Sequence, residues 1–338
     1  MSEAAAPTVV HVTTTDISLE LLLGPQLEAF AAAGWNVIGA SAPGDHVAAL
    51  EARGIRHVPV DHLTRSMDPR ADLRAARELY RLFKELKPDV VHTHNPKPGW
   101  LGRPAARAAR VPAVVNTVHG LYAQPTDGRT LRGMVRVLER GAAVFSDAEL
   151  IQNPEDTATL ARWGVPSERL IDLGNGIDLD RFDRREAMAG ERRDLREAWG
   201  VAGDTPVVVT VGRLVAEKGF RELFEAHRRL RRSGSNHELV VVGPTEAGKA
   251  DQLTEAEVAE ATADGVRLVG FSARPERYYA AADLFVLASH REGFPRAAME
   301  ASAMGLPAIA TDIRGCRQVV DDGVTGLLVP VKDADGME

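Results

Sequence analysis

Short apolar runs alternate with helix-like segments along this chain, and that alternation restricts the fold more than any other feature. In the first half, apolar runs of strand length occupy residues 8–15, 35–43, 57–61, 88–94 and 113–120. The segments between them have helical periodicity, at residues 19–34, 46–54, 72–86 and 99–110. Because parallel strands need crossover helices, the pattern predicts an α/β fold with a doubly wound parallel sheet.

The same pattern starts again in the second half. Strands are expected at residues 205–213, 237–243, 264–270, 283–289 and 307–311. Helices are expected at residues 220–230, 276–282 and 295–305. The 338 residues therefore predict two Rossmann-like domains, 1–180 and 181–338, with the charged segment 178–206 as their connection. Ligands of such sheets bind at the carboxyl ends of the strands, so we expect the domains to face each other across a cleft.

Charge, cysteine content and apolar run length argue against several classes of protein. The formal net charge of −7 does not favour nucleic acid as a partner. Cys316 is the only cysteine, which excludes an internal disulfide and a multi-cysteine metal cluster. The first residues lack the basic and apolar parts of a secretory signal, and no apolar run reaches the roughly 20 residues of a membrane-spanning helix. We expect a cytoplasmic protein.

Two cations follow the first expected strand of the second half. Gly212 and Arg213 end this strand, and Lys218 lies just before the next helix. A guanidinium, an ammonium and a helix N-terminus together suit a diphosphate. The alternative is that both cations are surface residues paired with Glu217 or Glu222.

Two carboxylates follow the fourth expected strand of the second half. Glu292 precedes the expected helix, and Glu300 lies inside it. Pro295 suits the first turn, which would leave the amides of Gly293 and Phe294 to face a ligand. Spread in this way, the carboxylates would hold two parts of one polyhydroxylated ligand.

An ordinary structural explanation of these carboxylates also exists. Arg296 and Glu300 are four residues apart and could form a surface pair worth roughly 0.3 kcal/mol. Glu292 could cap the amides of the helix.

Taken together, these segments resemble glycosyltransferase family 4, whose members are retaining enzymes with the two-domain GT-B fold. The motifs that carry the resemblance are VGRLVAEKG (211–219), REGFPRAAMEASAMGLPAIATD (291–312), DDGVTGLLVP (321–330) and GNGIDLDRF (174–182). The stretches NPKPGWLGR and NTVHG are similar to those of bacterial enzymes of polysaccharide and glycoconjugate assembly.

The resemblance implies a hexosyltransferase that moves a sugar from a nucleotide-sugar donor, with UDP favoured as the nucleotide, to a glycan, lipid-linked or small-molecule acceptor. Arg213 and Lys218 would hold the diphosphate, Glu300 the ribose and Glu292 the transferred sugar. The implied donor-binding residues are Gly212, Arg213, Lys218, Phe271, Glu292, Gly293, Phe294, Pro295 and Glu300. The implied catalytic residues are His119, Arg213, Lys218 and Glu292. No metal and no cofactor is predicted.

Several residues of the first half remain open to two explanations. The resemblance places His119 beside the donor sugar, but it could be a structural histidine. His92 and His94 share one face of a strand, and with no third ligand visible a zinc site is not expected. Lys97 could reach an acceptor anion or be solvated. The loop 13–18 is not glycine-rich, so Thr15 or Asp16 could face the acceptor.

Two helices carry basic stripes. The arginines are Arg70, Arg74, Arg77 and Arg81 in one, and Arg129, Arg132, Arg136 and Arg140 in the other. Such stripes usually form a solvated face, but they would also suit peripheral contact with an anionic membrane at its inner face.

Two other motifs are incomplete. GPTEAGKA (243–250) lacks the hydroxyl residue of a P-loop at Ala250, and the acid-x-acid pair of Asp178 and Asp180 falls in the expected connection. Family members usually continue through helices that cross back to the first domain, and we expect the second domain to lack them. A nucleotide-sugar-binding remnant, or an epimerase or hydrolase of the same architecture, therefore remains an alternative.

Overall fold

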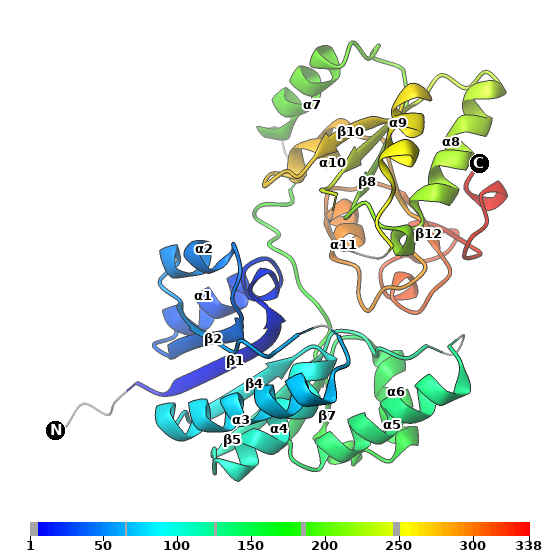
Figure 1. The fold of residues 1–338 in the computed structure, drawn as a ribbon. Coiled ribbons are helices and arrows are strands. Elements are labelled where there is room, and N and C mark those ends of the chain that lie inside the picture. The colour runs from blue at the N-terminus through cyan, green and yellow to red at the C-terminus, as the bar shows by residue number, and fades with distance from the viewer. Residues whose placement is uncertain (1–5, 65, 125–126, 184–186, 246–250) are drawn as a thin grey trace. The chain divides into compact units, whose positions relative to one another are not determined.

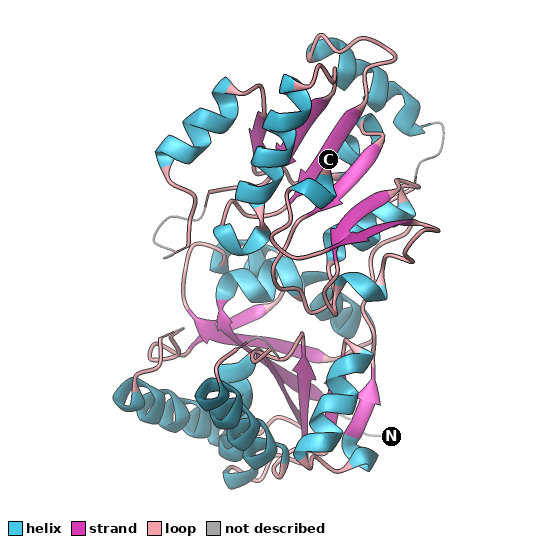
Figure 2. Cartoon of the chain, turned by 90° about the vertical axis from the view of Figure 1, so that its right-hand side faces the viewer, coloured by secondary structure: helices cyan, strands magenta, loops and turns pink. Residues whose placement is uncertain are grey.

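The computed structural model describes residues 6–64, 66–124, 127–183, 187–245 and 251–338. The chain divides into two compact units, Met1–Gly174 and Asn175–Glu338. Each unit holds one parallel sheet flanked by helices, as the ribbon and the secondary-structure colouring show (Figures 1 and 2). The predicted pair of doubly wound α/β units is confirmed.

The first unit contains a seven-stranded sheet in the order β3-β2-β1-β4-β5-β6-β7. Its strands are β1 (Thr8–Thr15), β2 (Asn36–Ala42), β3 (Arg56–Pro59), β4 (Val90–His94), β5 (Ala113–Val118), β6 (Ala148–Ile151) and β7 (Leu170–Asp172). Its helices are η1 (Ser18–Leu22), α1 (Gly24–Ala32), α2 (Val47–Ala52), α3 (Pro69–Leu86), α4 (Pro96–Ala108), α5 (Arg129–Ala143), α6 (Pro154–Trp163) and η2 (Ser167–Arg169). The strand order reverses between β1 and β4, which makes this the switch point of the sheet.

The second unit repeats this plan with six strands in the order β10-β9-β8-β11-β12-β13. Its strands are β8 (Val207–Val211), β9 (Glu238–Val242), β10 (Arg267–Gly270), β11 (Leu284–Leu287), β12 (Ala308–Thr311) and β13 (Gly326–Val329). Its helices are α7 (Ala187–Ala198), η3 (Ala216–Lys218), α8 (Phe220–Arg232), α9 (Glu255–Ala263), α10 (Glu276–Ala281), α11 (Arg296–Ala303), η4 (Cys316–Gln318) and η5 (Asp335–Met337). Here the order reverses between β8 and β11.

Each sheet is covered on both faces, which explains why its inner strands are apolar at nearly every position. In β1, Val10 and Val12 pack with Val91 of β4 on one face, while Val9 packs with residues of α1 on the other. In the second unit, Phe220 and Phe224 of α8 cover Val241 of β9. The two units therefore have separate hydrophobic cores.

The interpretation of residues 178–206 as a plain connection is wrong for residues 187–198 of that segment. It contains α7, which packs on α10 of the second unit. Arg192 donates from Nη2 to Asp283 at 2.6 Å and from Nη1 to the Ala282 carbonyl at 2.8 Å. Charged residues of α7 thus form hydrogen bonds with residues that directly follow α10.

Three strands escaped the sequence analysis: β6, β7 and β13. They have only three or four residues each, and β7 and β13 are edge strands with partly exposed residues. Their apolar pattern is too short to stand out from loop sequence.

Candidate active site

The turn between β8 and α8 is fixed by a glycine. Gly219 has a φ of 70°, and a Cβ atom at this position would lie 2.0 Å from the carbonyl oxygen of Ala288, just after β11. A side chain would therefore be strained by the backbone and blocked by its neighbour. The close approach brings Lys218, the residue before Gly219, to the loop that follows β11.

Lys218 meets Glu292 in that loop. Its Nζ lies 2.5 Å from Glu292 Oε1, and the Ser289 hydroxyl donates to the same oxygen at 2.7 Å. Glu222 instead contacts the His290 ring, whose Nε2 lies 3.0 Å from Glu222 Oε1. The alternatives that paired Lys218 with Glu217 or Glu222, or made Glu292 a helix cap, do not describe the structure.

The loop that carries Glu292 is held from three sides. Thr311 at the end of β12 donates to the Ser289 carbonyl at 2.5 Å, and Asn175 donates to the Phe294 carbonyl at 3.2 Å. A Cβ atom on Gly315 would lie 2.7 Å from the Glu292 carbonyl oxygen. Sequence reasoning missed all of these supports, since single serine, threonine and asparagine residues carry no signal of their own.

Glu300 lies inside α11 and is 9% exposed. The hydroxyl of Tyr279, on α10, donates to Glu300 Oε2 at 3.0 Å. Burial raises the pKa of Glu300, while the Tyr279 hydrogen bond and Arg296 lower it. Arg296 therefore acts on Glu300 as the pairing alternative expected, but the carboxylate is buried and not on the surface.

The other expected donor residues lie at the same edge of the sheet. Gly212 follows β8, and Phe271 follows β10 with 61% of its surface exposed. Pro295 directly precedes α11, which begins at Arg296. Arg213 and Gly293 both take part in interactions within the structure.

In the first unit, Asp16 ties two loops together. One of its carboxylate oxygens accepts from the Ile17 amide at 2.9 Å, and the other from the His46 amide at 2.8 Å. Thr15, beside it, has its hydroxyl 3.4 Å from that of Ser18. Thr15 is the last residue of β1 and Asp16 follows it, so both lie at the carboxyl end of this strand.

Lys97 is neither solvated nor free. It is 6% exposed, its Nζ lies 2.7 Å from Asp72 Oδ1, and it also donates to the Ser66 carbonyl. The solvated alternative is wrong, and an acceptor anion would have to replace Asp72.

The structure adds a histidine to those found in the sequence. His11 pairs in register with His92 across β1 and β4, and its Nδ1 lies 3.0 Å from His94 Nε2. The expectation that no third imidazole accompanies His92 and His94 is wrong. His94 Nδ1 in turn lies 3.0 Å from His119 Nε2, and burial lowers the pKa of His119 to about 4.

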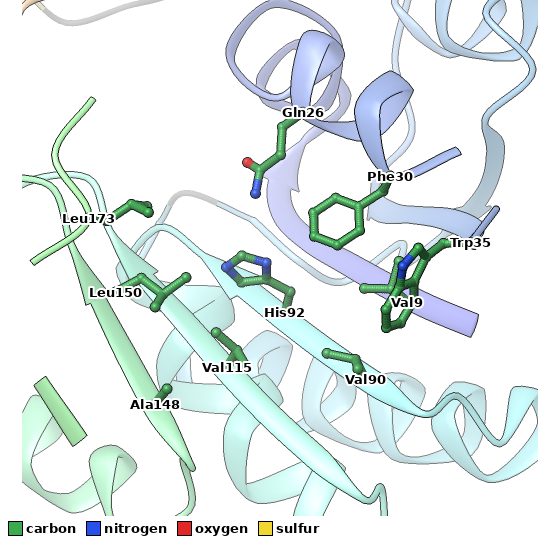
Figure 3. Close-up of a pocket in the computed structure, with 10 residues that line it drawn as sticks. All are labelled: Val9, Gln26, Phe30, Trp35, Val90, His92, Val115, Ala148, Leu150 and Leu173. Atoms are coloured by element: carbon green, nitrogen blue, oxygen red, sulfur yellow. The ribbon is translucent and has the colours of Figure 1, made fainter. Parts of the chain in front are cut away.

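A cavity of about 360 Å³ lies on the same face of the first sheet. His92 is central among its lining side chains, with Gln26 and Phe30 of α1 opposite (Figure 3). The remaining lining is apolar: Val9, Trp35, Val90, Val115, Ala148, Leu150 and Leu173. Val9 and Val90 lie near the amino ends of their strands, and none of the predicted donor residues lines this cavity.

The two incomplete motifs have different outcomes. Asp178 Oδ1 accepts from the amides of Asp180 and Arg181 at 3.0 and 3.2 Å, so the acid-x-acid segment forms a turn. Residues 246–250 of the stretch that resembles a P-loop lie outside the described residues.

Family profiles match both units. The profile described as Glycosyltransferase Family 4 matches residues 26–181, and that described as Glycosyl transferases group 1 matches residues 191–338. The UDP-Gal:alpha-D-GlcNAc-diphosphoundecaprenol alpha-1,3-galactosyltransferase of Escherichia coli is 31% identical over 83% of this chain and 72% of its own length. The chain belongs to glycosyltransferase family 4. The prediction of an enzyme that transfers sugars is thereby confirmed.

Further relatives of this glycosyltransferase agree with that assignment. The capsular polysaccharide biosynthesis glycosyltransferase CapM of Staphylococcus aureus is 26% identical over 96% of this chain and 84% of its own. The structure of Anabaena HepE with UDP and glucose is 20% identical, covers 97% of this chain and 87% of its own, and has a TM-score of 0.78. Sucrose-phosphate synthase of Thermosynechococcus elongatus has a TM-score of 0.80 at 23% identity, over 98% of this chain and 88% of its own. The predicted GT-B fold is confirmed.

Among the described residues, no helix combines the length and apolar character needed to cross a membrane.

Proposed function

We propose that this glycosyltransferase moves a hexose from a UDP-sugar to a glycan or lipid-linked acceptor, with retention of the anomeric configuration. The name of the Escherichia coli relative specifies a UDP-galactose donor and a diphosphoundecaprenol-linked acceptor. The HepE structures contain UDP, UDP with glucose, or UDP-glucose. The single observation that carries the proposal is the contact of Lys218 with Glu292 at the carboxyl edge of the second sheet.

Lys218 and Glu292 neutralise each other in this structure, and a donor would exchange that contact for two others. The ammonium would turn to the diphosphate, and the carboxylate would accept hydrogen bonds from hydroxyls of the transferred sugar. Arg213 would share the diphosphate charge with Lys218. Because negative charge grows on the diphosphate as the sugar leaves, these cations would stabilise the transition state more than the bound donor.

Glu300 would bind the two ribose hydroxyls of the nucleotide. Tyr279 fixes one carboxylate oxygen from a buried position, which orients the whole group. Phe271 would lie against the base, with backbone groups of residues 269–273 forming the remaining contacts. The amides of Gly293 and Phe294 and the turn at Pro295 would complete the sugar site.

Retention follows from the family resemblance, and it requires no protein nucleophile. The leaving phosphate would assist the attack of the acceptor on the same face of the sugar. His119 would contribute a hydrogen bond to a sugar hydroxyl and remain neutral, which its lowered pKa favours. With two cations at the diphosphate, we propose that no metal is required.

The acceptor would meet the first unit near Thr15 and Asp16. Lys97 would take part only after release from Asp72.

A lipid-linked acceptor would also require contact with an anionic bilayer, and α5 offers suitable chemistry. Its exposed apolar side chains are Met134 (40%) and Val137 (70%), and the exposed Val144 (66%) directly follows the helix. Its exposed basic side chains are Arg129, Arg132, Arg136 and Arg140. Apolar and basic residues together on one helix are typical of helices that lie on membranes.

The test is a transfer assay with purified full chain and a panel of UDP-, GDP- and ADP-sugars. Release of the nucleotide is followed with and without a lipid-diphosphate-linked sugar, and product configuration is read by NMR. The proposal expects turnover with a UDP-sugar only when acceptor is present, an α-linked product from an α-linked donor, and unchanged rates in EDTA. Sugar conversion without acceptor would favour an epimerase, and binding without turnover would favour the remnant.

A further inference from the structure

A line of four polar side chains crosses the first unit, and we name it the imidazole chain. It consists of His11 on β1, His94 on β4, His119 after β5 and Gln152 after β6. His11 Nδ1 lies 3.0 Å from His94 Nε2, and His94 Nδ1 lies 3.0 Å from His119 Nε2. His119 Nδ1 lies 3.2 Å from Gln152 Oε1. Every member except His119 is buried, and His119 is half-buried.

Each neutral imidazole has one N–H and one acceptor nitrogen, so the hydrogen bonds of the chain must all run in one direction. Gln152 Oε1 is an acceptor, which assigns the proton of His119 to Nδ1. His119 Nε2 then accepts from His94 Nδ1–H. His94 Nε2 accepts in turn from His11 Nδ1–H.

The far end of the chain supports the same direction. His11 Nε2 is buried and has no hydrogen-bond partner among the described residues. In the direction given above this atom is a bare lone pair, whereas in the opposite direction it would be a buried N–H without an acceptor. Buried N–H groups without partners are the rarer of the two in proteins. Both ends of the chain therefore assign the same tautomers.

We infer that His94, oriented by His11, is a positioning residue that holds His119 as its Nδ1–H tautomer. This inference rests on the proposed function, in which His119 faces the donor sugar. Because His94 occupies Nε2, the Nδ1–H is the group that His119 can offer to a substrate. His119 thus acts as a hydrogen-bond donor to a sugar hydroxyl oxygen, and Gln152 is the partner that the hydroxyl replaces.

A metal ion at these histidines is the competing explanation, and the geometry disfavours it. Ligand nitrogens of His11, His92 and His94 all lie within 4.8 Å of one another. Two nitrogens at ~2.0–2.1 Å from one tetrahedral zinc would lie about 3.3 Å apart, so a 4.8 Å spread would need a shift of the rings. The facing nitrogens of His11 and His94 are also already joined to each other.

His92 supplies a matched control. It belongs to the same buried group, but its Nε2 lies 2.7 Å from Thr117 Oγ1, so it bonds outside the imidazole chain. A substitution there disturbs packing of the same strand and leaves the bond from His94 to His119 in place.

The experiment is long-range ¹H–¹⁵N correlation NMR on the full chain with ¹⁵N-labelled histidine, combined with transfer kinetics. In the wild type, His119 is expected to carry its proton on Nδ1 at pH 7. His94→Leu should give His119 a mixture of tautomers and lower kcat by about 10- to 100-fold, with the donor KM changed much less. His94→Asn keeps an N–H near the position of Nδ1 and should restore the His119 signal and most of kcat. His92→Leu should leave the His119 tautomer unchanged. It should also leave kcat within about twofold of the wild type, a change below 0.5 kcal/mol in the barrier.

Three results would overturn the inference: an Nε2–H proton on His119 in the wild type, equal effects of His92→Leu and His94→Leu, or stoichiometric zinc whose removal changes the His119 spectrum. The NMR measurement of the His119 tautomer does not depend on catalytic turnover. A protein with the expected His119 signal but no transferase activity would contradict the proposed function alone.

Discussion

Lys218 Nζ lies 2.5 Å from Glu292 Oε1, although the two residues are 74 positions apart in the sequence. They meet because β8 and β11 are neighbours in the sheet, so the loops that follow these strands share one edge. Gly219 allows a close approach between these loops. In the proposed reaction the two charges separate, one to the diphosphate and one to the sugar.

Replacement of Lys218 by alanine tests the role of the ammonium. Loss of one donor to the developing diphosphate charge should raise the barrier by about 3 kcal/mol and lower kcat/KM by roughly 100-fold. Arg221→Ala is the matched control, since Arg221 lies in α8, shortly after Lys218, and forms an exposed pair with Glu257 of α9. Steady-state kinetics with saturating acceptor give kcat/KM for both variants. A decrease of less than twofold for Lys218→Ala would contradict the assignment.

Gly219→Ala tests whether the close approach to Ala288 builds the site. A Cβ atom with left-handed backbone costs about 1–2 kcal/mol, and the contact at 2.0 Å adds overpacking of roughly 1–3 kcal/mol. Gly234→Ala is the control, because Gly234 has a φ of 95° but nothing within 4 Å of its Cβ position. Urea unfolding should show a larger decrease in the free energy of unfolding for Gly219→Ala than for Gly234→Ala. Equal decreases would mean that the contact with Ala288 is unimportant.

Glu300→Gln separates binding from stability. Because Glu300 would hold the ribose with a charged acceptor, its neutral replacement should weaken UDP binding by roughly 10- to 100-fold, in line with about 1.5–3 kcal/mol for such bonds. Glu85→Gln, on an exposed part of α3, should bind UDP as the wild type does. Calorimetric titration with UDP gives both affinities, and an unchanged affinity in Glu300→Gln would rule out the ribose contact.

The same variant makes a pH prediction. Burial raises the pKa of Glu300 in the folded state, so the folded protein holds this proton more tightly than the unfolded chain. Wild-type stability should therefore fall as pH rises from the unfolded value of about 4.5 through the folded pKa. Glu300→Gln lacks this loss and should gain stability relative to the wild type at pH 7 but not at pH 4. A difference in stability that does not depend on pH would contradict the cause assigned to the shift.

Substitutions on α5 test membrane contact. Each basic residue near an anionic surface contributes about 1 kcal/mol, so Arg129→Gln with Arg136→Gln should weaken binding to phosphatidylglycerol vesicles by roughly 30-fold. Val137→Ser should weaken it further by removing apolar insertion. Arg74→Gln with Arg77→Gln, on α3, tests the other basic stripe at the same change in charge. Vesicle sedimentation at low salt measures all variants, and no binding by the wild type would end the proposal.

The alternating fold could be predicted from the sequence because it depends on local patterns, and the candidate donor residues, which stay a prediction, lie in short motifs of the same kind. Strand periodicity located β1, β4, β8 and β11, and the motif around Glu292 and Glu300 lies within one segment. The partners of these residues depend instead on strand order. His11 contacts His94 only because β1 lies beside β4 in the sheet. This strand order cannot be predicted from the sequence of either strand alone.

Supporting residues escaped prediction for a different reason. Tyr279 has the sequence surroundings of an ordinary core aromatic, yet its hydroxyl is bonded to Glu300. Ser289 and Thr311 are common residue types whose hydrogen bonds appear only when β11 and β12 are paired. The charges of α7 resembled those of a linker because their partners lie about 90 residues further along the chain, as for Arg192 and Ala282.

The most direct test of the account is a crystal structure of the protein soaked with UDP. The account predicts the diphosphate beside Arg213 and Lys218, with Lys218 released from Glu292, and the ribose hydroxyls on Glu300. Density for UDP at any other place, with the contact between Lys218 and Glu292 intact, would contradict it.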